Sequence, residues 1–147
     1  MPTRENDGEF TPPDRAYAHV FDVQKTDIDE LGHANNVVWV RWVNEAAIAH
    51  SRHVGLGPDV YLALQVLWVV RRHDIEYLVP ALEGERLEAM TWVATLRGAT
   101  SLRRTLFRRA SDGKPLARAA TTWAMVDLQG RPRRVPPEIL AKYGFSS

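Results

Sequence analysis

The chain has 147 residues, a formal net charge of +1 and no cysteine. This length is typical of a single domain, and the balanced charge gives no reason to expect nucleic acid or a membrane surface as a partner. Without cysteine there are no disulfides, thiolate nucleophiles or thiolate metal ligands, which fits a reducing, cytoplasmic location. No apolar run approaches the roughly 20 residues of a membrane span, and the first residues do not form a signal peptide.

The first residues differ in character from the rest of the chain. Residues 1–14 are polar and include Pro12-Pro13, so we expect a flexible N-terminal tail followed by one domain over residues 15–147. From residue 17, apolar and aromatic side chains alternate with other residues as far as about residue 24. This period of two predicts a first strand.

A helix is predicted from about residue 36 to residue 54. Either Asn35 or Asn36 is suited to cap its N-terminus, because an amide oxygen accepts a hydrogen bond from a backbone N–H without an intrahelical partner. Gly55 and the Gly57-Pro58 pair end the helix. One apolar face recurs at helical spacing and consists of Trp39, Trp42, Val43, Ala46, Ala47 and His50.

Strands are predicted for most of the remaining chain. The sequence from 61 to 80 reads as one long strand bent near Arg71-Arg72, and further strands are expected at 86–96, 102–110 and 115–128. A short helix is expected near 136–143. One helix among consecutive strands predicts an α+β domain, in which an antiparallel sheet of about five strands packs on one long helix.

Ionisable residues are concentrated in the loop before the long helix, DIDELGHANN at residues 27–36. A helix N-terminus has free backbone N–H groups and partial positive charge, and both stabilise an oxyanion formed during acyl transfer. Asp29 and His33 precede this N-terminus, and Gly32 permits a tight turn. The loop therefore predicts hydrolysis of an activated acyl group, with Asp29 as base or nucleophile. The alternative is a solvated cap on a core helix.

The stretch DIDELGHANNVVWVRWV resembles the signature of the 4-hydroxybenzoyl-CoA thioesterase family of hot-dog fold proteins, Asp-x-Asp-x-x-Gly-His-x-Asn-Asn-x-x-Tyr. A weaker likeness continues at 75–87 and 117–132, so that it extends over about residues 17–136. The final tyrosine of the signature is replaced by Trp39. The positions that match are Asp27, Asp29, Gly32, His33, Asn35 and Asn36.

This resemblance implies a sheet wrapped around a central helix, and a homodimer or tetramer of dimers with active sites at the subunit interfaces. It implies hydrolysis of acyl-CoA or acyl-ACP thioesters with no cofactor beyond the coenzyme A of the substrate. The catalytic carboxylate falls on Asp29, and the backbone amide of Asn36 is the expected oxyanion donor, with Val37 as a second. His33 matches a histidine that assists in acyl-ACP thioesterases, although those enzymes have asparagine at the position of Leu31.

Further substrate contacts are expected around the loop, from Gly32, Asn35, Val37 and Trp39. Arg103 and Arg104 are expected to bind the CoA phosphates, because guanidinium groups present paired donors. A metal site is not expected, since no carboxylate accompanies the histidines of the helix. Two other functions stay open: a hot-dog dehydratase, which would depend more on His33 than on Asp29, and a non-catalytic acyl-CoA binding protein.

Overall fold

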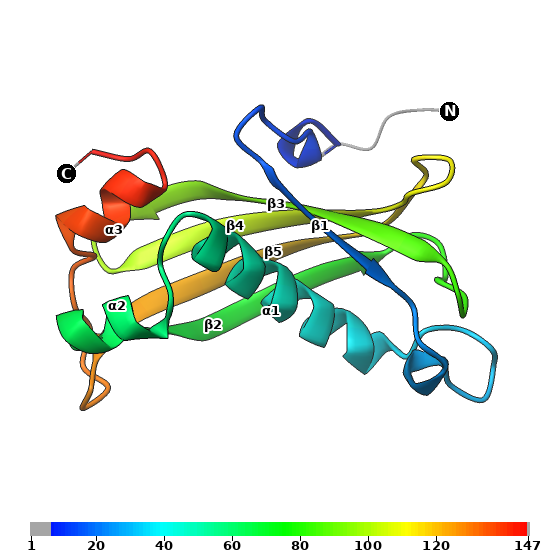
Figure 1. Cartoon of the computed structure of the whole chain (residues 1–147), viewed down its shortest axis with the longest axis horizontal. Helices are drawn as coiled ribbons and strands as arrows, with labels where there is room; N and C mark the ends of the chain where they lie inside the picture. Colours follow the sequence, from blue (N-terminus) through cyan, green and yellow to red (C-terminus); the bar gives the residue numbers. More distant parts are fainter. Residues whose placement is uncertain (1–6, 147) are drawn as a thin grey trace.

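The computed structural model describes residues 7–146. Its five strands form one antiparallel sheet in the order β1-β3-β4-β5-β2, and the long helix α1 (Asn36–His53) lies across one face of it (Figure 1). The predicted hot-dog architecture is confirmed. Within the described chain, no helix is long and apolar enough to cross a membrane. The strands are β1 (Tyr17–Asp22), β2 (Val66–Tyr77), β3 (Arg86–Arg97), β4 (Thr100–Arg109) and β5 (Pro115–Asp127).

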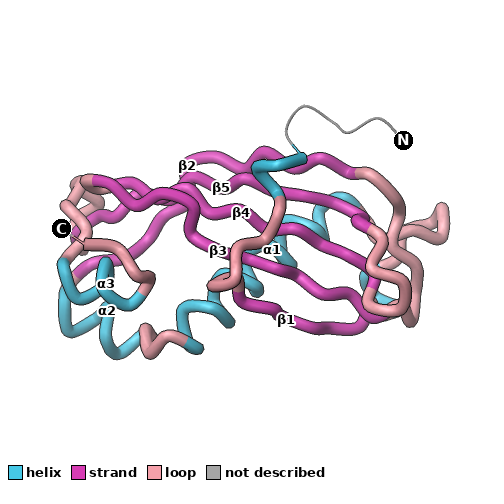
Figure 2. Tube along the Cα trace, turned by 90° about the horizontal axis from the view of Figure 1, so that it is seen from above, coloured by secondary structure: helices cyan, strands magenta, loops and turns pink. Residues whose placement is uncertain are grey.

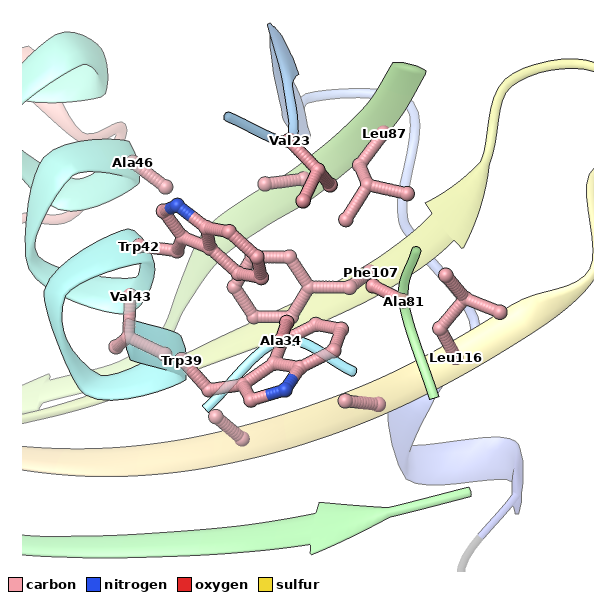
Figure 3. Packing of buried hydrophobic residues seen from close by; sticks show 13 residues of the cluster. Val23, Ala34, Trp39, Trp42, Val43, Ala46, Ala81, Leu87, Phe107 and Leu116 are labelled. Carbon is pink, nitrogen blue, oxygen red and sulfur yellow. The ribbon is translucent and has the colours of Figure 1, made fainter. Parts of the chain in front are cut away.

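Two tryptophans fasten α1 to the sheet. Trp39 and Trp42 are both buried, and their rings meet edge to face with centroids 4.8 Å apart (Figure 3). Trp39 also makes an edge contact with Phe107 of β4. Ala117 and Ala119 of β5 belong to the same core cluster, and their small side chains leave room for the indole rings.

The region that we expected to be one strand from residue 61 begins instead as a helix, α2 (Pro58–Leu64). Proline at the first helical position is favourable because it lacks only an N–H that would have no intrahelical partner. Gln65 then ends the helix in the left-handed region, with a φ of 57°. The expected bend is present in β2 as a register shift between Val70 and Arg72.

The two faces of the sheet are covered differently. Arg103 and Arg104 are neighbours on β4, so their side chains point to opposite faces. Arg103 contacts His50 of α1, whereas Arg104 lies by the Phe10 ring of a short 3-10 helix, η1 (Asp7–Phe10). Buried Phe10 thus packs on the outer face, within the segment expected to be a tail; residues 1–6 of that tail lie outside the described residues. Figure 2 places η1 and α1 on either side of the sheet.

One end of the molecule is closed by α2 and the C-terminal helix α3 (Pro137–Lys142) (Figure 2). Leu56, Val66, Ile139 and Tyr143 belong to a second apolar cluster at this end. The loop with the candidate catalytic residues lies at the opposite end, beyond the N-terminus of α1 (Figure 1).

Candidate active site

The loop between β1 and α1 is a compact turn closed by a bridge between Ile28 and Ala34. The N–H of Asp29 donates to the carbonyl of His33 at 2.8 Å, and the N–H of Gly32 donates back to the carbonyl of Asp29 at 3.1 Å. Gly32 has a φ of 81°, a conformation that other residues adopt only with strain. The glycine therefore allows the turn that brings Asp29 and His33 together.

The two oxygens of the Asp29 carboxylate have different surroundings. Oδ1 accepts the N–H of Leu31 at 2.9 Å and, at 3.4 Å, that of His33. Oδ2 makes no hydrogen bond or ion pair with any residue from 7 to 146. One oxygen thus orients the carboxylate within the loop, while the other is free to contact a substrate or water.

Asp27 is the anchor of the loop. Its side chain is 2% exposed; Oδ1 accepts from Arg41 Nη2 at 2.7 Å and Oδ2 accepts the N–H of Gln24 at 2.9 Å. Its carbonyl also accepts the N–H of Asn35 at 2.9 Å. Asp27 therefore holds the loop against α1, and its burial keeps the carboxylate out of reach of a substrate.

We expect Asp27→Asn to lower the free energy of unfolding by about 1–2 kcal/mol, because an amide cannot accept from both Arg41 and the backbone of Gln24. Urea unfolding of the variant and the wild type measures this change. An unchanged unfolding free energy would contradict the anchoring role.

The first turn of α1 presents one unpaired amide. Asn35 is the N-cap residue, and its side-chain oxygen accepts the N–H of Val37 at 3.0 Å. The expected second oxyanion donor, Val37, is therefore already engaged. The N–H of Val38 donates to the carbonyl of Asn35. The N–H of Asn36 has no acceptor among residues 7–146, and is the amide best placed to bind an oxyanion.

A pocket of about 400 Å³ adjoins this amide. It brings together five predicted residues and several that we did not predict. Among the latter is Tyr77 of β2, whose hydroxyl donates to the carbonyl of Asn36 at 3.3 Å. The strand pattern of 66–77 could have indicated a tyrosine on the inner face, but not that this strand end meets the loop. The predicted residues are Asp29, His33, Asn35, Asn36 and Trp39.

The other predicted substrate contacts lie elsewhere. Gly32 and Val37 do not line the pocket, and Arg103 and Arg104 are on β4, on opposite faces of the sheet. Arg103 is only 5% exposed and points between the sheet and α1. A guanidinium enclosed in this way does not reach phosphates at the protein surface, so the structure does not support that role for Arg103.

A second group of polar side chains lies under the C-terminal half of α1. Nη1 of Arg103 donates to Nδ1 of His50 at 2.9 Å and to Oγ1 of Thr91 at 3.1 Å. Since Nδ1 accepts, His50 is the neutral tautomer with its proton on Nε2. Burial, followed by the positive charge of Arg103, lowers the pKa of His50 to about 4.

The lowered pKa of His50 predicts that the folded protein is less stable in acid. An unfolded histidine takes up a proton near pH 6.5, whereas folded His50 resists protonation until about pH 4. Its contribution to stability is therefore complete above pH 6.5 and is lost as the pH falls towards 4, by up to about 3 kcal/mol. Urea unfolding at pH 7.5 and 4.5 measures this loss. The decrease in unfolding free energy between the two pH values should be smaller in His50→Gln than in the wild type. An equal decrease would contradict a neutral, buried His50.

Comparison with known proteins agrees with the fold. Residues 23–143 match the model of the thioesterase-like superfamily. The acyl-CoA thioester hydrolase YbgC of Escherichia coli is 30% identical over 118 residues, which cover 80% of this chain and 87% of YbgC.

Solved structures show the same fold. A 1,4-dihydroxy-2-naphthoyl-CoA thioesterase from Synechocystis superposes with a TM-score of 0.80 at 16% identity, covering 87% of this chain and 95% of that chain. A Staphylococcus aureus protein solved in complex with CoA superposes with a TM-score of 0.81 at 12% identity, covering 87% of this chain and 81% of that chain.

The family match and the similarity to YbgC show that the chain belongs to the thioesterase-like superfamily. The prediction that it is a thioesterase enzyme is confirmed at this level.

Proposed function

We propose that this protein hydrolyses acyl-CoA thioesters at the N-terminus of α1, with Asp29 as the catalytic carboxylate. The observation that carries the proposal is the pocket in which Asp29, His33 and the unpaired N–H of Asn36 meet. Similarity to YbgC, an acyl-CoA thioester hydrolase, supports coenzyme A as the thiol part of the substrate. Hydrolysis of carrier-protein thioesters is a further expectation.

The chemistry needs few groups. The thioester carbonyl oxygen accepts from the N–H of Asn36, where the dipole of α1 stabilises the negative charge that develops. Oδ2 of Asp29 either takes a proton from the attacking water or attacks the carbonyl carbon itself. The C–S bond then breaks, and the thiol leaves with little acid assistance because thiols ionise near pH 8.5. If Asp29 is the nucleophile, water next hydrolyses the mixed anhydride between the acyl group and Asp29, which releases the acid and restores the carboxylate.

His33 and Tyr77 have supporting roles in this proposal. The His33 side chain is exposed at the pocket, where an imidazole is able to pass a proton to the departing thiolate. Tyr77 holds the first turn of α1 through the carbonyl of Asn36. The N–H of Asn36 itself has no acceptor within the described chain and is available to the substrate.

The function is tested by thiol release from a panel of acyl-CoAs that differ in chain length and aromaticity. Because the chain has no cysteine, a thiol reagent reports released coenzyme A without background from the protein. Saturable turnover of at least one acyl-CoA is expected. Binding of acyl-CoA without turnover of any member would favour the non-catalytic alternative.

The proposal includes a homodimer formed through β2. This strand has 12 residues, lies at the edge of the sheet and leaves one row of backbone groups unpaired, which makes it a template for another strand. Exposed Leu67 and Tyr77 near its two ends would be covered by such pairing. Antiparallel pairing about a two-fold axis places the Val66 end of one β2 near the Tyr77 end of the other.

Hydrogen exchange tests this interface. We expect a mass of two chains by sedimentation, and slow exchange of the β2 amides that face away from β5, with faster exchange after dilution to single chains. A single-chain mass at all concentrations, with those amides exchanging as fast as exposed loops, would contradict dimerisation through β2.

A further inference from the structure

A second pocket, of about 330 Å³, lies between the C-terminal half of α1, helix α2 and the sheet. Its walls include the apolar or aromatic side chains of Ala47, Leu67 and Trp68. A pocket of this volume is at the small end of the range for ligand sites, which runs from about 300 to 1,000 Å³. The walls therefore suit a short apolar group rather than a long chain.

The polar lining of this pocket is unusual. Arg103 lines it and is only 5% exposed, and its contacts are neutral groups: His50, Thr91 and the ring of Tyr143. No carboxylate from residue 8 to residue 146 forms an ion pair with it. A buried charge without a counter-ion is unfavourable, so an anion bound here would be stabilised by Arg103.

Trp123 supplies a second donor. Its indole Nε1 is buried and has no acceptor within the described chain, and its side chain lines the same pocket. An indole N–H can only donate, so the group that satisfies it must carry an acceptor. Within the described part of the chain, the pocket therefore combines a guanidinium without a counter-ion and an indole N–H without an acceptor. A ligand with an apolar body and an anionic oxygen-bearing end suits both groups.

The position of the pocket relates it to the active site. Ala47 is eleven residues after Asn36 on α1, about 17 Å along the helix at 1.5 Å per residue, which is too far for a short acyl group within one chain. The pocket includes Leu67 and Trp68, at the start of β2. In the proposed dimer this end of β2 lies near the Tyr77 end of the other copy, where the active-site pocket of that copy opens.

We infer that this pocket binds the acyl group of the substrate, and that Arg103 and Trp123 select a short acyl group with a carboxylate at its far end. The inference rests on the proposed function, since it assigns the acyl part of that substrate. The apolar walls hold the methylene chain, the guanidinium pairs with the carboxylate, and the indole N–H donates to one of its oxygens.

Hexanoyl-CoA and adipoyl-CoA are matched probes, because their acyl chains have six carbons and differ in the terminal carboxylate. Binding of each probe is measured by calorimetric titration of the Asp29→Asn variant, which should not hydrolyse the probe during the titration. Adipoyl-CoA is expected to bind about tenfold to a hundredfold more tightly than hexanoyl-CoA. Adding Arg103→Met should abolish this preference. Arg108→Met is the matched control and should keep it, because Arg108 lies on the outer face and pairs with Glu88.

A second variant keeps the test valid if Arg103→Met does not fold. Trp123→Phe retains an aromatic ring without the N–H, and should reduce the preference for adipoyl-CoA by about twofold to tenfold while leaving hexanoyl-CoA binding unchanged. Equal binding of the two probes, or a preference that persists in both variants, would overturn the inference.

The two proposals can fail separately. Hydrolysis that depends on Asp29 and favours hexanoyl-CoA would leave the proposed function intact and overturn the selectivity. An Arg103-dependent preference for adipoyl-CoA, without hydrolysis of either probe, would support the pocket and contradict the proposed function.

Discussion

Asp29→Asn is expected to slow thiol release from acyl-CoA by a factor of about 10²–10⁴, the usual contribution of a positioned base. The amide oxygen of the new side chain still accepts the N–H of Leu31, which Oδ1 of Asp29 does at 2.9 Å in the wild type. The turn is therefore preserved, and we expect the variant to lose activity but not stability. Steady-state kinetics with a thiol reagent, alongside a thermal unfolding curve, measures both effects.

Glu30→Gln is the matched control, because it removes the neighbouring exposed carboxylate and should leave the rate unchanged.

His33→Ala distinguishes a thioesterase from a dehydratase. In a thioesterase it should reduce the rate much less than Asp29→Asn does, whereas a hot-dog dehydratase should show the reverse order. An Asp29→Asn variant with wild-type turnover would mean that the catalytic carboxylate is another residue.

Trp42→Ala is expected to lower the free energy of unfolding by about 3–5 kcal/mol, because it leaves a large cavity in a close-packed core. Trp42 is 1% exposed and its ring lies 5.0 Å from that of Phe21 and 4.8 Å from that of Trp39. In a chain of this size, such a loss lowers the melting temperature by roughly 10 °C.

The control for this change is Leu62→Ala, which removes an exposed side chain of α2 and should alter stability by less than about 0.5 kcal/mol. Calorimetry on the two variants compares them directly. Similar melting temperatures for both would contradict the central place of Trp42 in the core.

The helix and its capped start were predictable because their signals are local. Asn35 caps α1 through its own side chain, and the apolar face of the helix follows from spacing along the chain. The helix α2 also has local signals, in Gly57 and Pro58, but the β-prone residues after them predict a strand. Its first turn is stabilised by the proline, and its apolar residues pack against the second apolar cluster, which joins residues far apart in the chain and which no local pattern reveals.

The candidate site was predictable as a loop, but not in its details. Asp27 and Asp29 are two residues apart and chemically alike. Contacts with Arg41 and with the backbone of Gln24 distinguish the anchoring carboxylate from the available one. Arg103 and Arg104 are adjacent in the sequence, which predicts a shared role as phosphate ligands. Strand alternation separates them onto opposite faces, but the sequence alone does not say which face α1 covers.

The most direct test of the proposed function is a crystal structure of the Asp29→Asn variant with an intact acyl-CoA. The thioester carbonyl oxygen is expected within about 2.7–3.1 Å of the N–H of Asn36, with the carbonyl carbon beside the substituted side chain at position 29. An ordered acyl-CoA whose thioester lies away from the N-terminus of α1 would contradict hydrolysis at this site.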